Sequence, residues 1–522
     1  MNSLSHTRLT RRGFMKAASG AAAGASLGAL LRKQLSAASG LVADPDWESF
    51  DRALETGMLD FEMVGAAVSV LTPDEVAYSG MFGVRDLETG EPVTEDTHFL
   101  VASTTKSMTA ALIATFVDDG VLAWDQPVRE IYPHFRAPTD ELTETLRVRD
   151  MLDMASGIGE SDASAAFHQG DPTTDQLLVS LVNLPVVGAK GAQFFYNGAV
   201  YAAGGYLPAL ALGIDPADVG PVYASQIAER IYRPSGMATA CITDDPRPFS
   251  DNFATGYGPD LLVGTSRQPF APVGSYAPAG GTLATHGEMV RYVMMQLNRG
   301  VAHDGARIVS SENLTECWTS NVDVPYDADL TPDIVQSGYG MGWLTATYRD
   351  GRRFISPAGG IDGFPTFLGL MPEDGIGLVV NTNMMPPSRG LAFIQYVSAL
   401  LLETSFGLNT GASEMTLAQY RGAAQTLDDL AQTCRLPEWS EIAPWLGHYE
   451  KGWLLAFDED GSLRLRQSSR SIPLVVMPDG SYVMASGIAP GIPVHFSHDE
   501  SRLPRMEIEG LETVRWTVGV NG

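Results

Sequence analysis

The folded part of the chain begins with a helical pattern that leads into two apolar runs. A helix is expected from about Asp46, followed by the apolar residues 64–71 and, after a turn at Pro73 and Asp74, by residues 80–85. Two apolar runs on either side of a short turn are typical of paired antiparallel strands. This region therefore predicts the first two strands of a sheet.

Two further strands are expected much later in the sequence. Residues 366–371 and 376–382 are apolar runs separated by residues 372–375, a turn sequence that ends in glycine. Polar and apolar residues alternate only weakly in both runs, which predicts strands that are covered on both faces. A helix over residues 390–402 follows this hairpin and is expected to close the domain.

The region between the two strand pairs has the pattern of helices. Residues 104–118 predict a helix that ends before Gly120, and residues 128–291 are mostly helical segments and loops rich in Gly and Pro. The apolar positions of the first helix fall on one face: Met108, Ala111, Leu112 and Phe116. Strands, helices, strands and a final helix predict an α+β fold, in which an antiparallel sheet is joined to a helical subdomain.

The pattern changes again in the last part of the chain. Small and polar residues at 409–413, with a helix to about Cys434, predict a linker, and residues 445–518 predict short strands separated by turns. Short strands of this kind favour a small all-β, barrel-like module. The expected boundaries are a signal peptide at 1–38, a main domain at 44–407, a linker helix at 408–436 and a C-terminal β module at 437–520.

The first residues resemble an export signal. Residues 10–16 read Thr-Arg-Arg-Gly-Phe-Met-Lys, an Ala/Gly-rich run covers 17–31, and small residues at 36–39 offer a cleavage site. A membrane anchor is the alternative, but spanning takes about 20 apolar residues, and this run has 15 with few Leu and Ile. We expect a twin-arginine signal, a periplasmic or secreted mature protein, and no integral membrane segment in the mature chain.

Charge and cysteine content narrow the class of partner. The chain carries a net charge of −28, and removing the signal with its six basic residues takes this to −34. Such a surface repels phosphate backbones, so nucleic acid is not an expected partner, and solubility is the simplest reading of the charge. Cys241, Cys317 and Cys434 form no CxxC, so neither a disulfide framework nor a cysteine-bound metal is expected.

The strongest chemical signal is Ser103-Thr104-Thr105-Lys106 at a predicted helix start. The backbone N–H of a serine there is free to bind an oxyanion, and a lysine three residues later lies on the same face within reach of the serine oxygen. A buried lysine can lose its charge and act as a base. The alternative is a capping serine followed by a solvated lysine. Lysine is rare, however: the mature chain has only Lys106, Lys190 and Lys451.

Several ordered segments make the sequence resemble the β-lactamase-related serine hydrolases, which include class C β-lactamases, DD-peptidases and esterases. The resemblance covers about residues 46–406. It implies a sheet of five or more antiparallel strands, a helical subdomain, and a site in the cleft between them. Residues 44–407 are then the serine hydrolase domain. The segments that carry the resemblance are 86–90, 99–106, 119–122, 148–158, 278–283 and 339–343.

The resemblance also implies a tyrosine opposite the serine. In the family's Tyr-x-Asn motif, Tyr196 takes the tyrosine position, and its phenol can pass a proton between the serine, the lysine and the leaving group. Asn197 and Gly198 beside it are candidate substrate-binding positions. Gly198 replaces the family's asparagine and so lacks an amide that contacts the substrate in relatives. Tyr201 is the alternative for the tyrosine role.

A third family motif, Lys-Thr-Gly or His-x-Gly on a strand, corresponds to Pro357-Ala358-Gly359-Gly360. Gly359 allows close backbone approach to a substrate, and the resemblance implies that the N–H of Gly360 is the second oxyanion donor. Pro357 stands in the cationic position and the hydroxyl is also missing. Each lost charge-assisted hydrogen bond costs about 1.5–3 kcal/mol, which argues against penicillins and D-Ala-D-Ala ends.

Other chemistries have no motif in the mature chain. The only G-x-S-x-G lies at 24–28 within the signal, and the chain has no H-E-x-x-H, P-loop or G-x-G-x-x-G. No metal or organic cofactor is expected. The favoured function is a carboxylesterase on small neutral esters or lactones. The alternatives are an amidase or peptidase for unusual peptides, such as D-residue or cyclic-derived ones, then a transacylase, a β-lactamase, or a non-catalytic binding relative. The C-terminal module either narrows access to the site or serves stability or assembly.

Overall fold

The computed structural model describes residues 45–159, 172–243, 245–270, 272–325, 334–361, 363–385, 392–406, 411–467, 470–486, 490–509 and 512–519. The predicted twin-arginine segment lies outside these residues. Within them, no helix combines the length and the apolar character that crossing a membrane would require.

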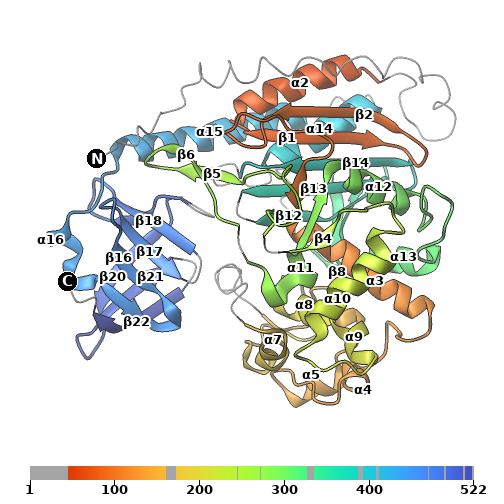
Figure 1. Ribbon diagram of the computed structural model, residues 1–522, viewed down its shortest axis with the longest axis horizontal. Helices are drawn as coiled ribbons and strands as arrows, with labels where there is room; N and C mark the ends of the chain where they lie inside the picture. Colours follow the sequence, from red (N-terminus) through yellow and green to blue (C-terminus); the bar gives the residue numbers. More distant parts are fainter. Residues whose placement is uncertain are drawn as a thin grey trace.

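An antiparallel sheet forms the centre of the larger domain (Figure 1). In the described part of the chain it has nine strands in the order β2-β1-β14-β13-β11-β10-β9-β8, with β12 paired to β13 beside β11. The first pair of strands and the late hairpin, predicted from regions about 300 residues apart, meet toward one edge of the sheet, where β1 pairs with β14. The strands are β1 Gly65–Leu71, β2 Val76–Gly83, β8 Val322–Asp323, β9 Ile334–Tyr339, β10 Leu344–Tyr348, β11 Arg353–Ser356, β12 Ala358–Ile361, β13 Phe364–Met371 and β14 Ile376–Thr382.

Helices cover both faces of this sheet, as the weak alternation in the late strands predicted. On β14, Leu378 and Val380 join the core under helices α2 (Trp47–Asp60) and α14 (Ala392–Phe406). Val379, between them, joins the opposite core, which includes α3 (Thr105–Asp118) and α12 (His286–Leu297). All residues of β13 and β14 are buried.

Helix α3 lies between the sheet and the helical subdomain. The predicted apolar face, Met108 to Phe116, is buried, but so is every other residue from Thr105 to Phe116. A helix with no polar face belongs in the interior of a large domain. The described helices of the subdomain are α4 Val128–Ile131, α5 Asp140–Thr145, α7 Thr174–Ser180, α8 Gly198–Gly205, α9 Leu207–Ala211 and α10 Val219–Ile227 (Figure 1).

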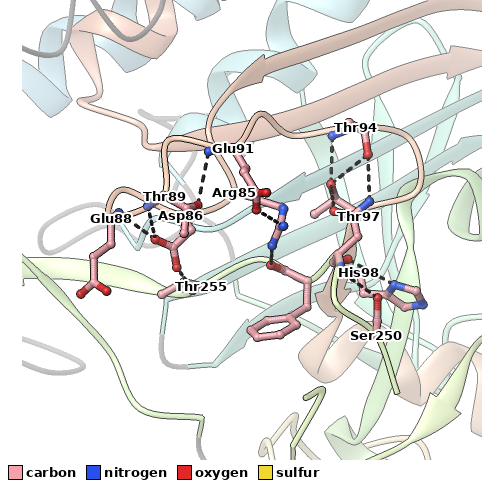
Figure 2. Close-up of polar contacts among 12 residues, drawn as sticks. Arg85, Asp86, Glu88, Thr89, Glu91, Thr94, Thr97, His98, Ser250 and Thr255 are labelled. Atoms are coloured by element: carbon pink, nitrogen blue, oxygen red, sulfur yellow. Dashed lines mark hydrogen bonds and ion pairs between the residues drawn. The ribbon is translucent and has the colours of Figure 1, made fainter. Parts of the chain in front are cut away.

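A polar network holds the loop after β2 against the segment that precedes strand β5 (Figure 2). The carboxylate of Asp86 accepts hydrogen bonds from the backbone N–H of Glu88 and Thr89 and from the hydroxyl of Thr255. Burial opposes the charge on Asp86, but these hydrogen bonds hold its pKa below the ordinary value. The network fixes the start of the hairpin described next.

The hairpin of β5 (Tyr257–Asp260) and β6 (Gly264–Arg267) runs from the sheet to the C-terminal module. At its base, the N–H of Met385 donates to the carbonyl of Tyr257 at 2.9 Å. At its tip, the N–H of Leu261 donates to the carbonyl of Ala485 at 2.8 Å.

The C-terminal module is a closed antiparallel barrel, as expected. Helix α15 (Ala412–Thr433) precedes it and packs on the larger domain, where the ring of Tyr420 lies 4.4 Å from that of Phe61. The α+β fold with a β-lactamase/transpeptidase-like sheet, a helical subdomain and a barrel-like module is therefore confirmed. The barrel strands are β15 Gly447–Tyr449, β16 Leu454–Phe457, β17 Leu463–Gln467, β18 Arg470–Val476, β19 Tyr482–Met484, β20 Pro493–His498, β21 Pro504–Ile508 and β22 Glu512–Gly519.

Candidate active site

Ser103 lies where a strand gives way to the buried helix. Strand β3 (His98–Leu100) ends just before a 3₁₀ turn, η1 (Ala102–Thr104), which runs into α3. Ala102 has φ +47°, a left-handed conformation that costs a non-glycine residue about 1–3 kcal/mol. The surroundings stabilise it: the carbonyl of Val101 accepts hydrogen bonds from the hydroxyls of Thr104 at 2.6 Å and Thr366 at 2.7 Å.

Three predicted side chains meet at this point. The Oγ of Ser103 lies 3.1 Å from the Nζ of Lys106 and 2.9 Å from the Oη of Tyr196. A serine oxygen in contact with an amine and a phenol is an arrangement for moving its proton. Ser103 and Tyr196 are both half-buried.

Lys106 is buried, with 3% of its surface exposed. Its Nζ donates a second hydrogen bond to the carbonyl of Ala279 at 2.8 Å, and among the described residues no carboxylate forms an ion pair with it. The rings of Tyr196 and Tyr201 lie 4.9 and 5.5 Å from the same atom. Lys106 is thus held between the serine oxygen and a backbone carbonyl.

Tyr201, the alternative to Tyr196, is placed elsewhere. It is completely buried, and its Oη donates to the backbone carbonyl of Lys106 at 2.7 Å. Burial raises its pKa well above the ordinary value for tyrosine. Its hydroxyl therefore braces helix α3, whereas the hydroxyl of Tyr196 contacts Ser103.

Asn197 and Gly198 start helix α8 instead of facing outward. The side chain of Asn197 is buried; its Oδ1 accepts from the N–H of Val200 at 2.8 Å and its Nδ2 donates to the carbonyl of Ile158 at 3.1 Å. Gly198 is the first residue of the helix and is also buried. These contacts make Asn197 an N-cap that holds the turn after Tyr196.

Of the two glycines of β12, Gly359 lies against the backbone of Ser103. A Cβ at Gly359 would stand 2.5 Å from the carbonyl oxygen of Val101 and 3.0 Å from the N atom of Ser103, so the strand needs glycine there. Gly360 is exposed, and a Cβ on it would lie 3.5 Å from the Cε of Met385. Pro357, in the expected cationic position, is buried.

A serine–histidine contact occurs separately, in the core. His286 bonds the hydroxyl of Ser69 and the side-chain oxygen of Asn381, each at 2.8 Å. His286 is completely buried, which lowers its pKa to about 4, and Ser69 is 1% exposed. No substrate can reach this trio, so it joins α12 to the sheet.

Sequence reasoning found the three side chains but not their backbone partners. Ala279 lies in one of the family-like segments, yet nothing in the pattern marks its carbonyl, and Thr366 was assigned only to a strand. Among the described residues, no group of three His, Cys, Asp or Glu side chains is placed to hold a metal ion.

A β-lactamase/transpeptidase fold with serine, lysine and tyrosine in contact defines a class of serine hydrolases. The profile of the family described as Beta-lactamase matches residues 50–401. The chain therefore belongs to the β-lactamase family.

Named relatives are identical to the chain at about a quarter of the aligned residues. An unguisins hydrolase of Aspergillus campestris is 25% identical over 65% of this chain, which spans 62% of the relative's length. Penicillin-binding protein 4 of Amycolatopsis lactamdurans is 26% identical over 65% of this chain and 84% of its own. The D-alanyl-D-alanine-carboxypeptidase/endopeptidase AmpH of Escherichia coli K12 is 25% identical over 58% of this chain and 76% of its own.

Solved structures share the fold. The octameric penicillin-binding protein homologue from Pyrococcus abyssi superimposes with a TM-score of 0.60 at 21% identity, over 90% of this chain and all of that one. A likeness at this identity concerns the fold alone.

Proposed function

We propose that Ser103 is the nucleophile of an acyl-transfer hydrolase and that Lys106 is its base. The observation that carries this proposal is the position of the serine Oγ, within hydrogen-bond distance of both the Nζ of Lys106 and the Oη of Tyr196. Neutral Lys106 takes the proton of Ser103 as the oxygen attacks a carbonyl carbon. The backbone N–H groups of Ser103 and Gly360 hold the resulting oxyanion.

Tyr196 completes the proton transfers. As the tetrahedral intermediate collapses, the bond to the leaving group breaks and Tyr196 gives its proton to the departing oxygen or nitrogen. The ammonium of Lys106 then returns a proton to the phenolate of Tyr196. The acyl group of the substrate now remains on Ser103 as an ester. A water molecule, positioned by the same groups, then hydrolyses this ester and restores the serine.

We propose neutral esters or lactones as the substrates. Pro357 and Gly198 offer no charge and no amide where relatives hold a carboxylate or an acylamino group. Ester leaving groups depart more readily than amines, so esters need fewer positioning contacts. Hydrolysis of unusual peptides is the second candidate, favoured by the names of relatives such as the D-aminopeptidase of Cereibacter sphaeroides.

A fluorophosphonate probe tests the nucleophile. It should label the wild type and fail to label Ser103→Ala, with Ser107→Ala, on the same helix but bonded to the carbonyl of Thr104, as the matched control. Equal labelling of wild type and Ser103→Ala would end the assignment. No labelling of a folded wild type would favour a non-catalytic binding relative.

A substrate panel tests the ester preference. It pairs p-nitrophenyl esters of short and medium acids with D- and L-aminoacyl nitroanilides and a chromogenic cephalosporin. Ester hydrolysis should be fastest. Rapid cephalosporin opening, or amide cleavage without ester cleavage, would contradict the inferred loss of carboxylate binding.

We also propose export by the twin-arginine route. Replacing both Arg11 and Arg12 by lysine should retain the protein inside a bacterial host that exports the wild type. Unchanged export of the double variant would contradict this route.

A further inference from the structure

A tight turn lies directly behind the loop that carries Tyr196. The Oδ1 of Asp153 accepts a hydrogen bond from the backbone N–H of Ala155 at 2.9 Å. Met154, enclosed by this turn, has φ +57°, a conformation that side chains other than glycine adopt at a cost. The carboxyl of Asp153 is therefore the polar group that closes the turn and holds Met154 in place.

Met154 contacts the backbone on both sides of Tyr196. Its carbonyl accepts from the N–H of Phe195 at 2.8 Å, and its sulfur lies 3.2 Å from the N–H of Asn197. The next residue of the turn continues the attachment, because the carbonyl of Ala155 accepts from the N–H of Gly191 at 2.7 Å. The loop from 191 to 197 is thus tied to this turn at both of its ends.

Asp153 occupies an unusual place for an acid. It is 4% exposed, and burial raises its pKa to about 7. Among the described residues, Asp150 raises that pKa further and Arg149 and Lys190 lower it, while Asp153 in turn raises the pKa of Tyr339. A buried acid retained at such a cost in desolvation points to a specific task.

We propose that Asp153 is a positioning residue for Tyr196: its carboxyl oxygen fixes the turn through which Met154 holds the backbone on either side of the tyrosine. This inference rests on the proposed function only for the consequence in catalysis. The contacts themselves exist whether or not Tyr196 is the proton donor.

Hydrogen exchange measures the positioning without any turnover. Asp153→Ala removes the acceptor, so amides in residues 191–197 should exchange at least several-fold faster than in the wild type. Asp153→Asn keeps an oxygen acceptor of the same shape and should preserve slow exchange. Asp215→Ala, which removes the same kind of acceptor from an exposed turn where Asp215 accepts from the N–H of Ala217, is the matched control and should leave this loop unchanged.

Turnover measures the consequence for Tyr196. A p-nitrophenolate leaves without a proton, whereas an alkoxide needs one from Tyr196. Asp153→Ala should therefore lower kcat for alkyl esters roughly ten-fold more than for p-nitrophenyl esters, and Asp153→Asn should restore the wild-type ratio. If Asp153→Ala fails to fold, Asp153→Val fills the site without an acceptor and takes its place.

Unchanged exchange in the folded Ala or Val variant, or equal acceleration in the Asn variant, would overturn the proposal. A wild type that hydrolyses no ester would instead contradict the proposed function, and the exchange comparison would still decide the role of Asp153.

Discussion

Ser103 is approached from two sides that offer different kinds of group. The helical side brings the amine of Lys106 and the phenol of Tyr196, both within 3.1 Å of the serine oxygen. The strand side brings the backbone of Gly359 and Gly360 in β12, which have no side chains, and Pro357 before them is buried. Proton transfer and substrate recognition are thus separated. Changes on the helical side should slow every substrate, and changes on the strand side should alter which substrates fit.

The helical side should show the largest effect, at Lys106. Lys106→Ala removes the base and should lower acylation by roughly 10²–10⁴ for all esters. Lys106→Arg should fail similarly, because arginine stays charged. Stopped-flow acylation with p-nitrophenyl esters, together with thermal unfolding to confirm the fold, measures this. Near-normal rates in either variant would move the base role to Tyr196.

Asp153, which supports the loop of Tyr196 on the helical side, should make the stability of the folded protein depend on pH. With a pKa near 7 in the folded protein and near 4 when unfolded, Asp153 holds its proton more tightly when folded. Wild-type stability therefore falls as pH rises from about 4 to 7, by at most about 4 kcal/mol from this residue.

The side chain introduced by Asp153→Asn cannot lose a proton. The free energy of unfolding of this variant should therefore rise relative to that of the wild type over this pH range. Its unfolding midpoint, measured by calorimetry, should rise relative to the wild type from pH 4 to 7 and then stay level. A difference independent of pH would show that Asp153 does not titrate in this range.

The strand side can be disturbed by one methyl group. Gly359→Ala would place a Cβ 2.5 Å from the carbonyl oxygen of Val101 and 2.6 Å from the hydroxyl of Thr366. Overpacking of this kind costs about 1–3 kcal/mol of stability, and acylation should fall because the strand must shift away from Ser103. Gly360→Ala has room for its Cβ and should lose less. Equal losses in both variants would mean that a side chain at either glycine position blocks the substrate.

Local spacing explains why part of the site could be predicted. Ser103 and Lys106 lie on one helical turn, so their contact follows from sequence separation alone. The contact between Thr366 and Val101 joins residues 265 positions apart, and no local pattern encodes it. Helix α3 shows the same limit: its apolar face was predicted, but not that the subdomain would bury its other faces. The role of the turn at Asp153 could not be predicted either, because the burial of this acid depends on residues that are distant in the sequence.

The smallest effect should come from the barrel, acting through the β5–β6 hairpin. Leu261 and Leu262 at its tip pack against Val475 and Val483 of the barrel, while its base bonds Met385, the neighbour of Gly360. We expect this route to adjust the strand side alone. Leu261→Ala should change the ratio of bulky to small ester turnover by less than about ten-fold and leave labelling of Ser103 intact.

Truncation after Leu436 should shift the ester ratio in the same direction and further. Leu212→Ala, at an exposed leucine of the helical subdomain, is the control and should leave the ratio unchanged. An unaltered substrate profile in a folded truncation would support a role for the barrel in stability or assembly. Slower labelling of Ser103 in Leu261→Ala would contradict the separation of proton transfer from substrate recognition, because it would show that the barrel also affects the helical side.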